Sequence, residues 1–173
     1  MTLTYELKFF DYWHLSSGLS AGAKLDSSVT KDDNQIPYAS GKTIKGLARE
    51  MAQLLYDDSF VKRCFGEEGI DNGRCYFKNA QLSKIEKEEI ISNKLQNHLY
   101  DIIASTKIEN SIAVDDTLRE IEVVVPLTLN GKILDIEKED YEKLKQSLLM
   151  IKRMGLNRNR GLGRCTFIIG EEK

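Results

Sequence analysis

Glycine and arginine are concentrated in one stretch of the chain, residues 154–167, which reads MGLNRNRGLGRCTF. Five basic residues and no acidic residue occur between positions 150 and 164: Lys152, Arg153, Arg158, Arg160 and Arg164. Gly161 and Gly163 would let backbone N–H groups approach an anion closely, and arginine binds phosphate oxygens in a bidentate way. The composition favours a loop that binds phosphates without reading bases, but a solvated turn has the same composition.

A second candidate anion site is the predicted helix start SGKTIKGLAR, residues 40–49. A helix N-terminus offers unpaired N–H groups and a partial positive charge, which suits phosphate. An ordinary capped helix with surface lysines fits the pattern as well, and a P-loop is excluded because Ile36 stands where that motif requires glycine. The candidate RNA-binding residues of this stretch are Ser40, Gly41, Lys42, Lys45 and Arg49.

Residues 11–36 form a long polar stretch that contains His14, an isolated Asp26 and the Asp32–Asp33 pair. A lone carboxylate in a loop is usually just solvated, and no Ser/His/Asp spacing accompanies it. No second carboxylate with fixed geometry indicates a two-metal site either. With His98 as its only companion, His14 does not suggest a metal cluster. From these residues alone, catalysis by Asp26 remains one alternative beside simple solvation.

Length and composition predict one soluble domain, residues 1–173, with no membrane-spanning segment and no signal peptide. The formal net charge is −2, so a nucleic-acid site would have to be a local basic patch. Three cysteines without C-x-x-C spacing predict reduced thiols and a cytoplasmic location.

Hydrophobic periodicity predicts the elements that must position these residues. Residues 3–10 alternate as a half-buried strand, and Ile44, Leu47, Ala48, Met51 and Leu55 share one face of a helix that begins near Lys42. A final helix begins with acids at 135–140 and ends with Lys152 and Arg153 before Gly155. The remaining predictions are a strand at 74–82, a helix at 84–104, a strand at 118–129 and a strand at 164–169.

This order predicts an α+β fold of the ferredoxin-like (RRM-like) βαββαβ type. A helical insertion would separate the second and third strands, and the glycine-rich loop would precede the last strand. Helices would cover one face of the sheet and leave the other face free, as in RNA-recognition modules.

Five segments in order resemble the RAMP (repeat-associated mysterious protein) superfamily, and within it the Csm/Cmr-type backbone subunit of type III CRISPR RNA-guided effector complexes. HLSSG resembles a His-x-Gly-Ser-Gly element, and GLNRNRGLGRCTF resembles the family's C-terminal glycine-rich loop. KLDSSVTKDDNQIPYASGKTIKGLAR resembles an aspartate-bearing loop followed by the family's helix start. The other two matching segments are CFGEEGIDNGRCYFKNAQL and TKIENSIAVDDTLREIEVV.

The resemblance implies a subunit that binds CRISPR guide RNA and target RNA. It would stack with copies of itself or related RAMP subunits in a filament, beside other type III effector subunits and away from membranes. Asp26 falls on the family's loop aspartate, which supports Mg²⁺-dependent endoribonuclease cleavage of target RNA in the assembled complex. Guide-backbone contacts fall on His14, Lys42, Lys45 and Arg49, and the glycine-rich loop falls on Arg158, Arg160, Gly161, Gly163 and Arg164.

Two departures from the family keep alternatives open. Residues 39–42 read Ala-Ser-Gly-Lys where the family has Pro-Gly-Ser-Ser, and residues 111–120 are short where a thumb hairpin is expected. The chain could therefore be a non-catalytic RNA-binding RAMP subunit. A guide-processing RAMP endoribonuclease is a further alternative, with His14 as its only candidate acid or base.

Overall fold

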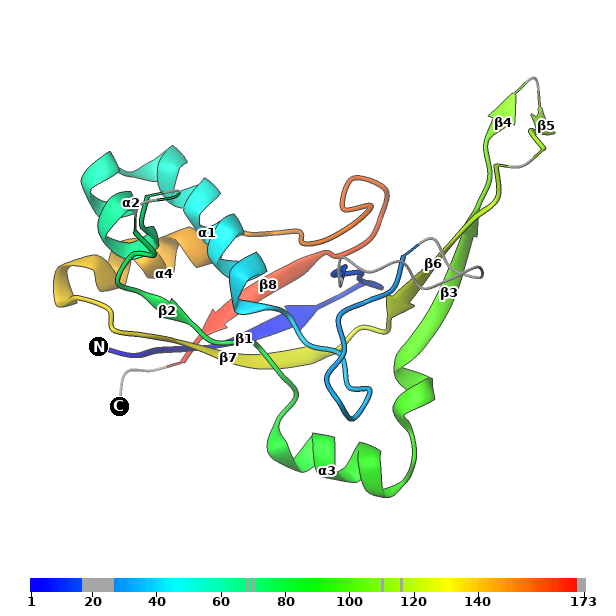
Figure 1. Cartoon of the computed structure of the whole chain (residues 1–173), viewed down its shortest axis with the longest axis horizontal. Coiled ribbons are helices and arrows are strands. Elements are labelled where there is room, and N and C mark those ends of the chain that lie inside the picture. Colours follow the sequence, from blue (N-terminus) through cyan, green and yellow to red (C-terminus); the bar gives the residue numbers. More distant parts are fainter. Residues whose placement is uncertain (17–26, 68, 70, 110, 116, 171–173) are drawn as a thin grey trace.

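The main sheet of the computed structural model has four strands in the order β2-β7-β1-β8 (Figure 1). Every neighbouring pair is antiparallel, with Tyr5 opposite Gly131 and Leu7 opposite both Leu129 and Phe167. The structure describes residues 1–16, 27–67, 69, 71–109, 111–115 and 117–170. The strands are β1 (Leu3–Phe9), β2 (Tyr76–Phe77), β7 (Thr128–Leu134) and β8 (Cys165–Ile169).

Helices cover one face of this sheet and form the core with it. The predicted alternation of β1 is confirmed, because Leu3, Tyr5, Leu7 and Phe9 are buried and the residues between them are exposed. These side chains pack against the apolar faces of the helices. This packing removes apolar surface of both layers from water. The covering helices are α1 (Gly41–Leu55), α2 (Asp58–Phe65) and α4 (Tyr141–Leu149).

The insertion between β2 and β7 differs from the predicted helix at 84–104. A short helix ends at Ser92, and the chain then enters a long antiparallel ribbon that projects from the sheet (Figure 1). Tyr100 pairs with Val124 and Ser105 with Arg119 along it. Its elements are α3 (Lys84–Ser92), η2 (Gln96–Leu99), β3 (Tyr100–Ser105), β4 (Ile108–Glu109), β5 (Ile112–Ala113) and β6 (Arg119–Val124).

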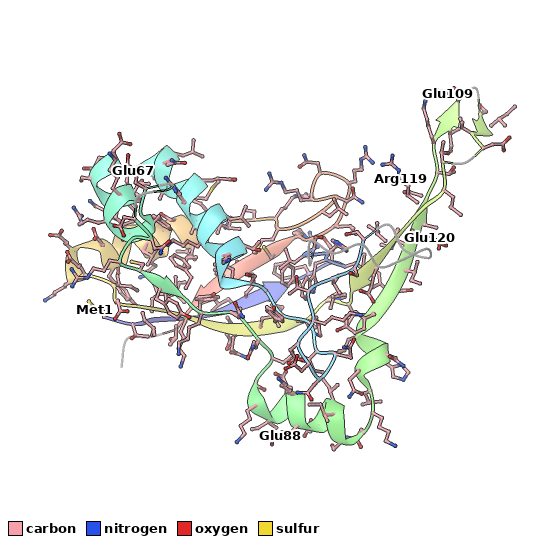
Figure 2. All side chains as sticks on the ribbon, in the orientation of Figure 1. Met1, Glu67, Glu88, Glu109, Arg119 and Glu120 are labelled. Atoms are coloured by element: carbon pink, nitrogen blue, oxygen red, sulfur yellow. The ribbon has the colours of Figure 1, made fainter. Side chains whose placement is uncertain are left out.

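The ribbon corrects two sequence-based expectations. Leu95, Leu99, Ile102 and Ile103 do not form one helical stripe, because Ile103 packs instead with a small cluster of Ile121, Val123 and Leu162. The segment at 111–120, which looked too short for a thumb hairpin, is only the outer part of a hairpin that begins at Tyr100. Charged side chains such as Glu109, Arg119 and Glu120 line this projection (Figure 2).

The predicted strand 118–129 is two strands in different sheets. Pro126 lies between β6 and β7, where the missing N–H donor costs no ladder hydrogen bond. The last helix is also shorter than predicted, since a 3-10 turn, η3 (Lys138–Asp140), precedes α4 and the helix ends at Leu149. Its buried positions Tyr141, Leu144 and Leu148 are as predicted.

All three cysteines are buried in the structure. Within the described residues, no helix combines the length and the apolar character that a membrane crossing requires.

The close approach of β1 and β7 gives a first prediction. A Cβ at Gly131 would overlap the buried Tyr5 ring, which itself packs 5.1 Å from Phe167, centroid to centroid. We expect Gly131→Ala to lower the free energy of unfolding by about 1–3 kcal/mol, as overpacking does. Gly46→Ala is the control, because nothing lies within 4 Å of its Cβ position and helix propensity should make it neutral or stabilising. Urea denaturation measures both, and an unchanged Gly131→Ala protein would contradict the packing argument.

Candidate nucleic-acid interface

The start of α1 is capped by the chain itself. The Ser40 hydroxyl accepts from the Lys42 N–H at 3.3 Å, and the Asn79 side-chain oxygen accepts from the Gly41 N–H at 2.9 Å. A Cβ at Gly41 would overlap the backbone of Phe77, so this glycine serves a close approach to β2. Two N–H groups of the predicted phosphate-binding site are therefore already hydrogen-bonded within the chain. Ser40 and Gly41 have structural roles here.

The cations of α1 lie beside a hollow of about 680 Å³ next to β2. Lys42 is exposed, whereas Lys45 and Arg49 are half-buried. Lys45 donates to the backbone oxygen of Asn72, which holds its ammonium at the wall of the hollow. Partial burial lowers the pKa of Lys45, and the Arg49 charge acts in the same direction. No carboxylate of the described residues forms an ion pair with these three side chains. Asp135 also lines the hollow, but Lys42, Lys45, Arg49 and Arg74 outnumber it, so the hollow suits an anion.

The two glycines of the glycine-rich loop have different roles. Gly163 is buried at φ +70°, its N–H donates to the Tyr12 oxygen at 2.8 Å, and a Cβ would overlap the Met154 backbone. Gly161 is exposed at φ +93°, with nothing within 4 Å of its Cβ position. Only Gly161 therefore leaves open backbone for a ligand, while Gly163 fixes the loop onto the segment that follows β1.

The arginines of this loop are also divided. Arg158 and Arg160 are exposed, and Arg153 donates to the Arg158 backbone oxygen at 2.9 Å. Arg164 instead forms an ion pair with Asp11 at 3.2 Å and lies over the Phe10 ring. Arg164 precedes β8 at the base of the loop, where its backbone pairs with that of Arg153, and Asp11 already engages its guanidinium.

The two predicted anion sites lie near opposite edges of the main sheet. The hollow with Lys42, Lys45 and Arg49 borders β2, and the loop with Arg158 and Arg160 leads into β8 at the other edge. In Figure 1, α1 lies between β2 and the loop. The basic residues therefore form two separate candidate phosphate-binding sites. Only an extended ligand could contact both sites at once.

His14 is fully buried rather than exposed to a ligand. Its Nδ1 lies 2.5 Å from the Glu122 backbone oxygen and its Nε2 lies 2.9 Å from the Ser27 hydroxyl. A carbonyl only accepts, so Nδ1 carries the proton, and in the neutral ring Nε2 accepts from Ser27. Both ring nitrogens are thus occupied. The imidazole connects the segment that follows β1 to Glu122 on β6 and to Ser27. Asp26 lies outside the described residues.

Glu122 is an important residue that the sequence analysis missed. Its carboxylate accepts from the Val29 N–H at 3.1 Å and from Lys31 at 2.6 Å, and its own N–H donates to the Ser27 oxygen. Lys31 also lies 3.9 Å from the centre of the Tyr100 ring. Residues 27–31 are therefore fastened to both strands of the ribbon at its base. The sequence feature that could have identified Glu122 is its place as the acid in the otherwise apolar run IEVVV. An acid in such a run indicates a carboxylate with a buried partner.

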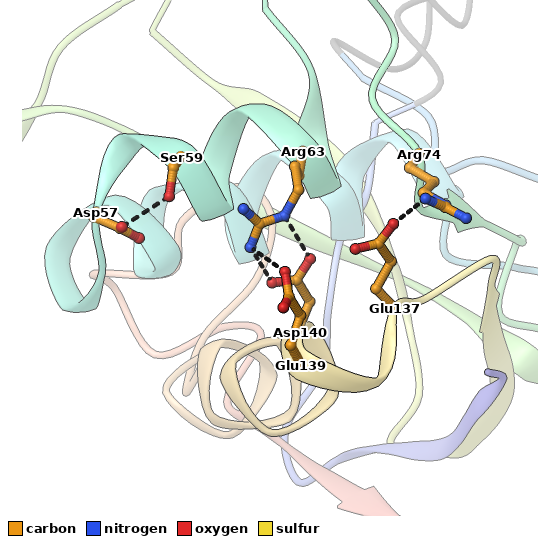
Figure 3. Close-up of polar contacts among 7 residues, drawn as sticks. All are labelled: Asp57, Ser59, Arg63, Arg74, Glu137, Glu139 and Asp140. Carbon is orange, nitrogen blue, oxygen red and sulfur yellow. Dashed lines mark hydrogen bonds and ion pairs between the residues drawn. The ribbon is translucent and has the colours of Figure 1, made fainter.

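A group of three acids has the spacing of a metal site but a different explanation. One oxygen each of Glu137, Glu139 and Asp140 lies within 4.8 Å of the others. Arg63 binds Asp140 at 2.6 Å and Glu139 at 3.3 Å, and Arg74 pairs with Glu137 (Figure 3). Each acid of this group pairs with one of the two arginines, and Asp140 raises the pKa of Arg63. The acids therefore join α2 to the start of α4.

Comparison with known proteins gives the family. The model of the RAMP superfamily matches residues 6–166, and the chain belongs to that superfamily. No curated protein matches the sequence.

Two solved structures share the fold over nearly the whole chain. A chain of the "Type III-B Cmr-beta bound to cognate target RNA" structure has a TM-score of 0.76 at 10% identity, covering 98% of this chain and 97% of that one. A chain of the "Type III-B Cmr-beta" apo-state structure has a TM-score of 0.76 at 10% identity, covering 99% and 98%. At this identity the likeness shows the fold.

The Glu122 contacts give a second prediction. Glu122→Ala removes the acceptor of the Val29 N–H, so hydrogen exchange at Val29 should accelerate roughly tenfold, in line with the loss of a bond to a charged group. The Ala39 N–H donates to the Ala80 oxygen at 2.9 Å outside this segment and should keep its protection as an internal reference. Glu88→Ala, at an exposed helix site, is the matched control. Equal exchange at Val29 in all three proteins would remove Glu122 from this role.

Proposed function

We propose that this chain is an RNA-binding subunit of a type III CRISPR effector complex, where it carries guide RNA. The observation that carries the proposal is the likeness of the whole chain to chains of Type III-B Cmr-beta structures, one of which holds cognate target RNA. Membership of the RAMP superfamily supports it. The unpaired cations on α1 and on the glycine-rich loop give a chemical reason, because phosphate contacts dominate RNA affinity.

The main sheet fits the ferredoxin-like βαββαβ unit that we propose for the fold. Read from the other edge, its order is β8-β1-β7-β2, so the first strand lies between the last strand and the third strand of that unit. Helix α1 connects β1 to β2, helix α4 connects β7 to β8, and both lie on one face. The ribbon and α3 then form the insertion, which is more strand than helix.

The phosphate backbone of the guide would extend from one basic site to the other. Lys42, Lys45 and Arg49 would hold one part of the backbone, and Arg158 with Arg160 and the open Gly161 N–H would hold another. None of these groups is placed to select a base, so we expect the binding to tolerate any guide sequence.

The ribbon would serve as the thumb that interrupts a guide–target duplex. It projects from the sheet in Figure 1, and Ile108, Ile112 and Leu118 near its tip are all more than 60% exposed. Apolar side chains on a projection can insert between stacked bases. Copies of the chain stacked in a filament would present such ribbons at regular steps.

Asp26 would support cleavage of the target RNA beside this ribbon. Its sequence neighbour Ser27 is held to β6 by the Glu122 N–H and to His14, so position 27 lies at the ribbon base. The ribose supplies its own 2′-hydroxyl nucleophile. A carboxylate there would hold Mg²⁺, which stabilises charge at the scissile phosphate. A non-catalytic RNA-binding subunit is the second candidate, and it differs only at this residue.

A guide-processing nuclease is the less favoured alternative, because its candidate acid or base, His14, is buried with both ring nitrogens engaged.

Cleavage gives the third prediction. In the assembled complex with Mg²⁺, Asp26→Asn should slow target cleavage about a hundredfold or more while guide binding is retained. Asp33→Asn, an exposed acid of the same stretch, is the control. Chelation of Mg²⁺ with EDTA should stop cleavage in the wild-type complex. Wild-type cleavage rates in Asp26→Asn would assign the chain to the non-catalytic alternative.

Guide binding gives the fourth prediction. Lys42→Glu with Arg49→Glu, and separately Arg158→Glu with Arg160→Glu, should each weaken binding of single-stranded RNA at least tenfold. The slope of log K against log salt should fall by about 1.4, since each phosphate contact contributes about 0.7. The loss should be equal for guides of unrelated sequence. Lys94→Glu with Lys138→Glu, which makes the same charge change at exposed sites elsewhere, should leave the slope unchanged.

A further inference from the structure

The main sheet has a second face, which the helices α1, α2 and α4 do not cover. This face carries the side chains of the exposed strand positions. The segment that leads to α3 lies along one edge of the face. A hollow of about 590 Å³ lies on this face over β1 and β7. We call it the open face, and define it by Thr4, Glu6, Lys8, Phe10, Lys78, Asn130, Lys132, Arg164, Thr166 and Ile168.

Two lysines of the open face stand directly opposite each other. The Lys78 N–H donates to the Lys132 backbone oxygen at 3.0 Å, which continues the pairing of Phe77 with Ile133. Both side chains are exposed, and like charges at such cross-strand positions are destabilising. Neither lysine forms an ion pair with any described residue, and nor does Glu6, the acid of this face. A bound anion would relieve the repulsion.

An exposed aromatic ring continues the basic surface toward the far end of β1. Phe10 is 42% exposed, with Lys8 5.6 Å and Arg164 5.5 Å from its ring centre. At the other end of the face, Lys84 joins Lys78 and Lys132 in the lining of the hollow. From Thr4 to Phe10 the strand extends about 20 Å.

We propose that the open face binds a second stretch of single-stranded RNA, with Lys8, Lys78 and Lys132 on its phosphates and Phe10 stacked on a base. Single-strand sites combine a basic groove with exposed aromatic platforms, as this face does. The Gln81 amide at the rim can bind ribose and base edges, whereas the Asn79 oxygen and the Ser83 hydroxyl cap α1 and α3. Protein interfaces are instead depleted in lysine, so a polyanion fits this surface better than a protein partner does.

The inference deepens the proposed function, because it adds a strand beside the guide. The hollow with Lys42, Lys45 and Arg49 is built on α1, which packs on the covered face of the sheet. The two RNA sites are therefore on different sides of the same sheet, and a single variant set can remove one and keep the other.

The test is binding of a fluorescein-labelled oligouridylate to the purified full chain, followed by anisotropy over a range of salt. Lys78→Gln with Lys132→Gln should weaken binding roughly tenfold and lower the salt slope by about 1.4. Phe10→Ala should also weaken binding roughly tenfold, with little effect on the slope. Lys94→Gln with Lys138→Gln is the charge-matched control and should bind as wild type.

Folding is checked independently. Removing the repulsion between Lys78 and Lys132 should leave the melting temperature of the double variant equal to or above that of wild type, so weaker binding will not reflect unfolding. Ultraviolet crosslinking with peptide mapping should place RNA on the peptide that contains Phe10.

The outcomes separate this inference from the proposed function. Wild-type binding by the Lys78 and Lys132 variant, together with weak binding by Lys42→Gln with Arg49→Gln, would overturn the inference and leave the guide site standing. The reverse result would support the open face and count against the α1 site. Failure of the open-face variant to join the complex, with normal RNA binding, would identify a protein contact and overturn the inference.

Discussion

The contacts of Glu122 hold together the parts of the molecule on which function depends. Its backbone oxygen accepts from His14, its N–H donates to Ser27, and its carboxylate binds Val29 and Lys31. The side chain is only 12% exposed, so these bonds form where water competes little. They connect the segment after β1, the loop that contains Asp26 and the base of the ribbon. A carboxylate in an apolar strand is costly unless it is fully bonded, and this one has its partners.

The distribution of charge explains how an acidic chain can bind a polyanion. Acids gather where arginines already neutralise them, as Glu137, Glu139 and Asp140 do beside Arg63 and Arg74 (Figure 3). Among the residues that the structure describes, no acid forms an ion pair with the basic residues on α1, on the glycine-rich loop or on the open face, apart from Asp11 with Arg164. Fields at a surface follow local charge because salt screens beyond about 10 Å. The net charge of −2 therefore says little about any one face.

The sequence predicted the elements whose periodicity is strong and local. The alternation of β1 and the apolar stripe of α1 were sufficient, because each pattern reports burial against a single core. The helix predicted at 84–104 is confirmed only for α3 (Lys84–Ser92), because Ile102 and Ile103 are β-branched residues of a strand in the ribbon. Residue types at the candidate site were informative, whereas their locations were not. Gly163 and Ser40 make hydrogen bonds within the fold and Arg164 pairs with Asp11, and only tertiary contacts determine such partners.

The ribbon leaves and rejoins the domain at neighbouring points, where Tyr100 faces Val124 and Val124 pairs with Trp13. Residues added or lost near the outer turns would therefore lengthen or shorten the projection without moving the core, since loop closure changes slowly with length. The length of the ribbon can therefore change in evolution independently of the core. A longer or shorter ribbon would change how far the protein reaches across a bound molecule, while the sheet would be preserved.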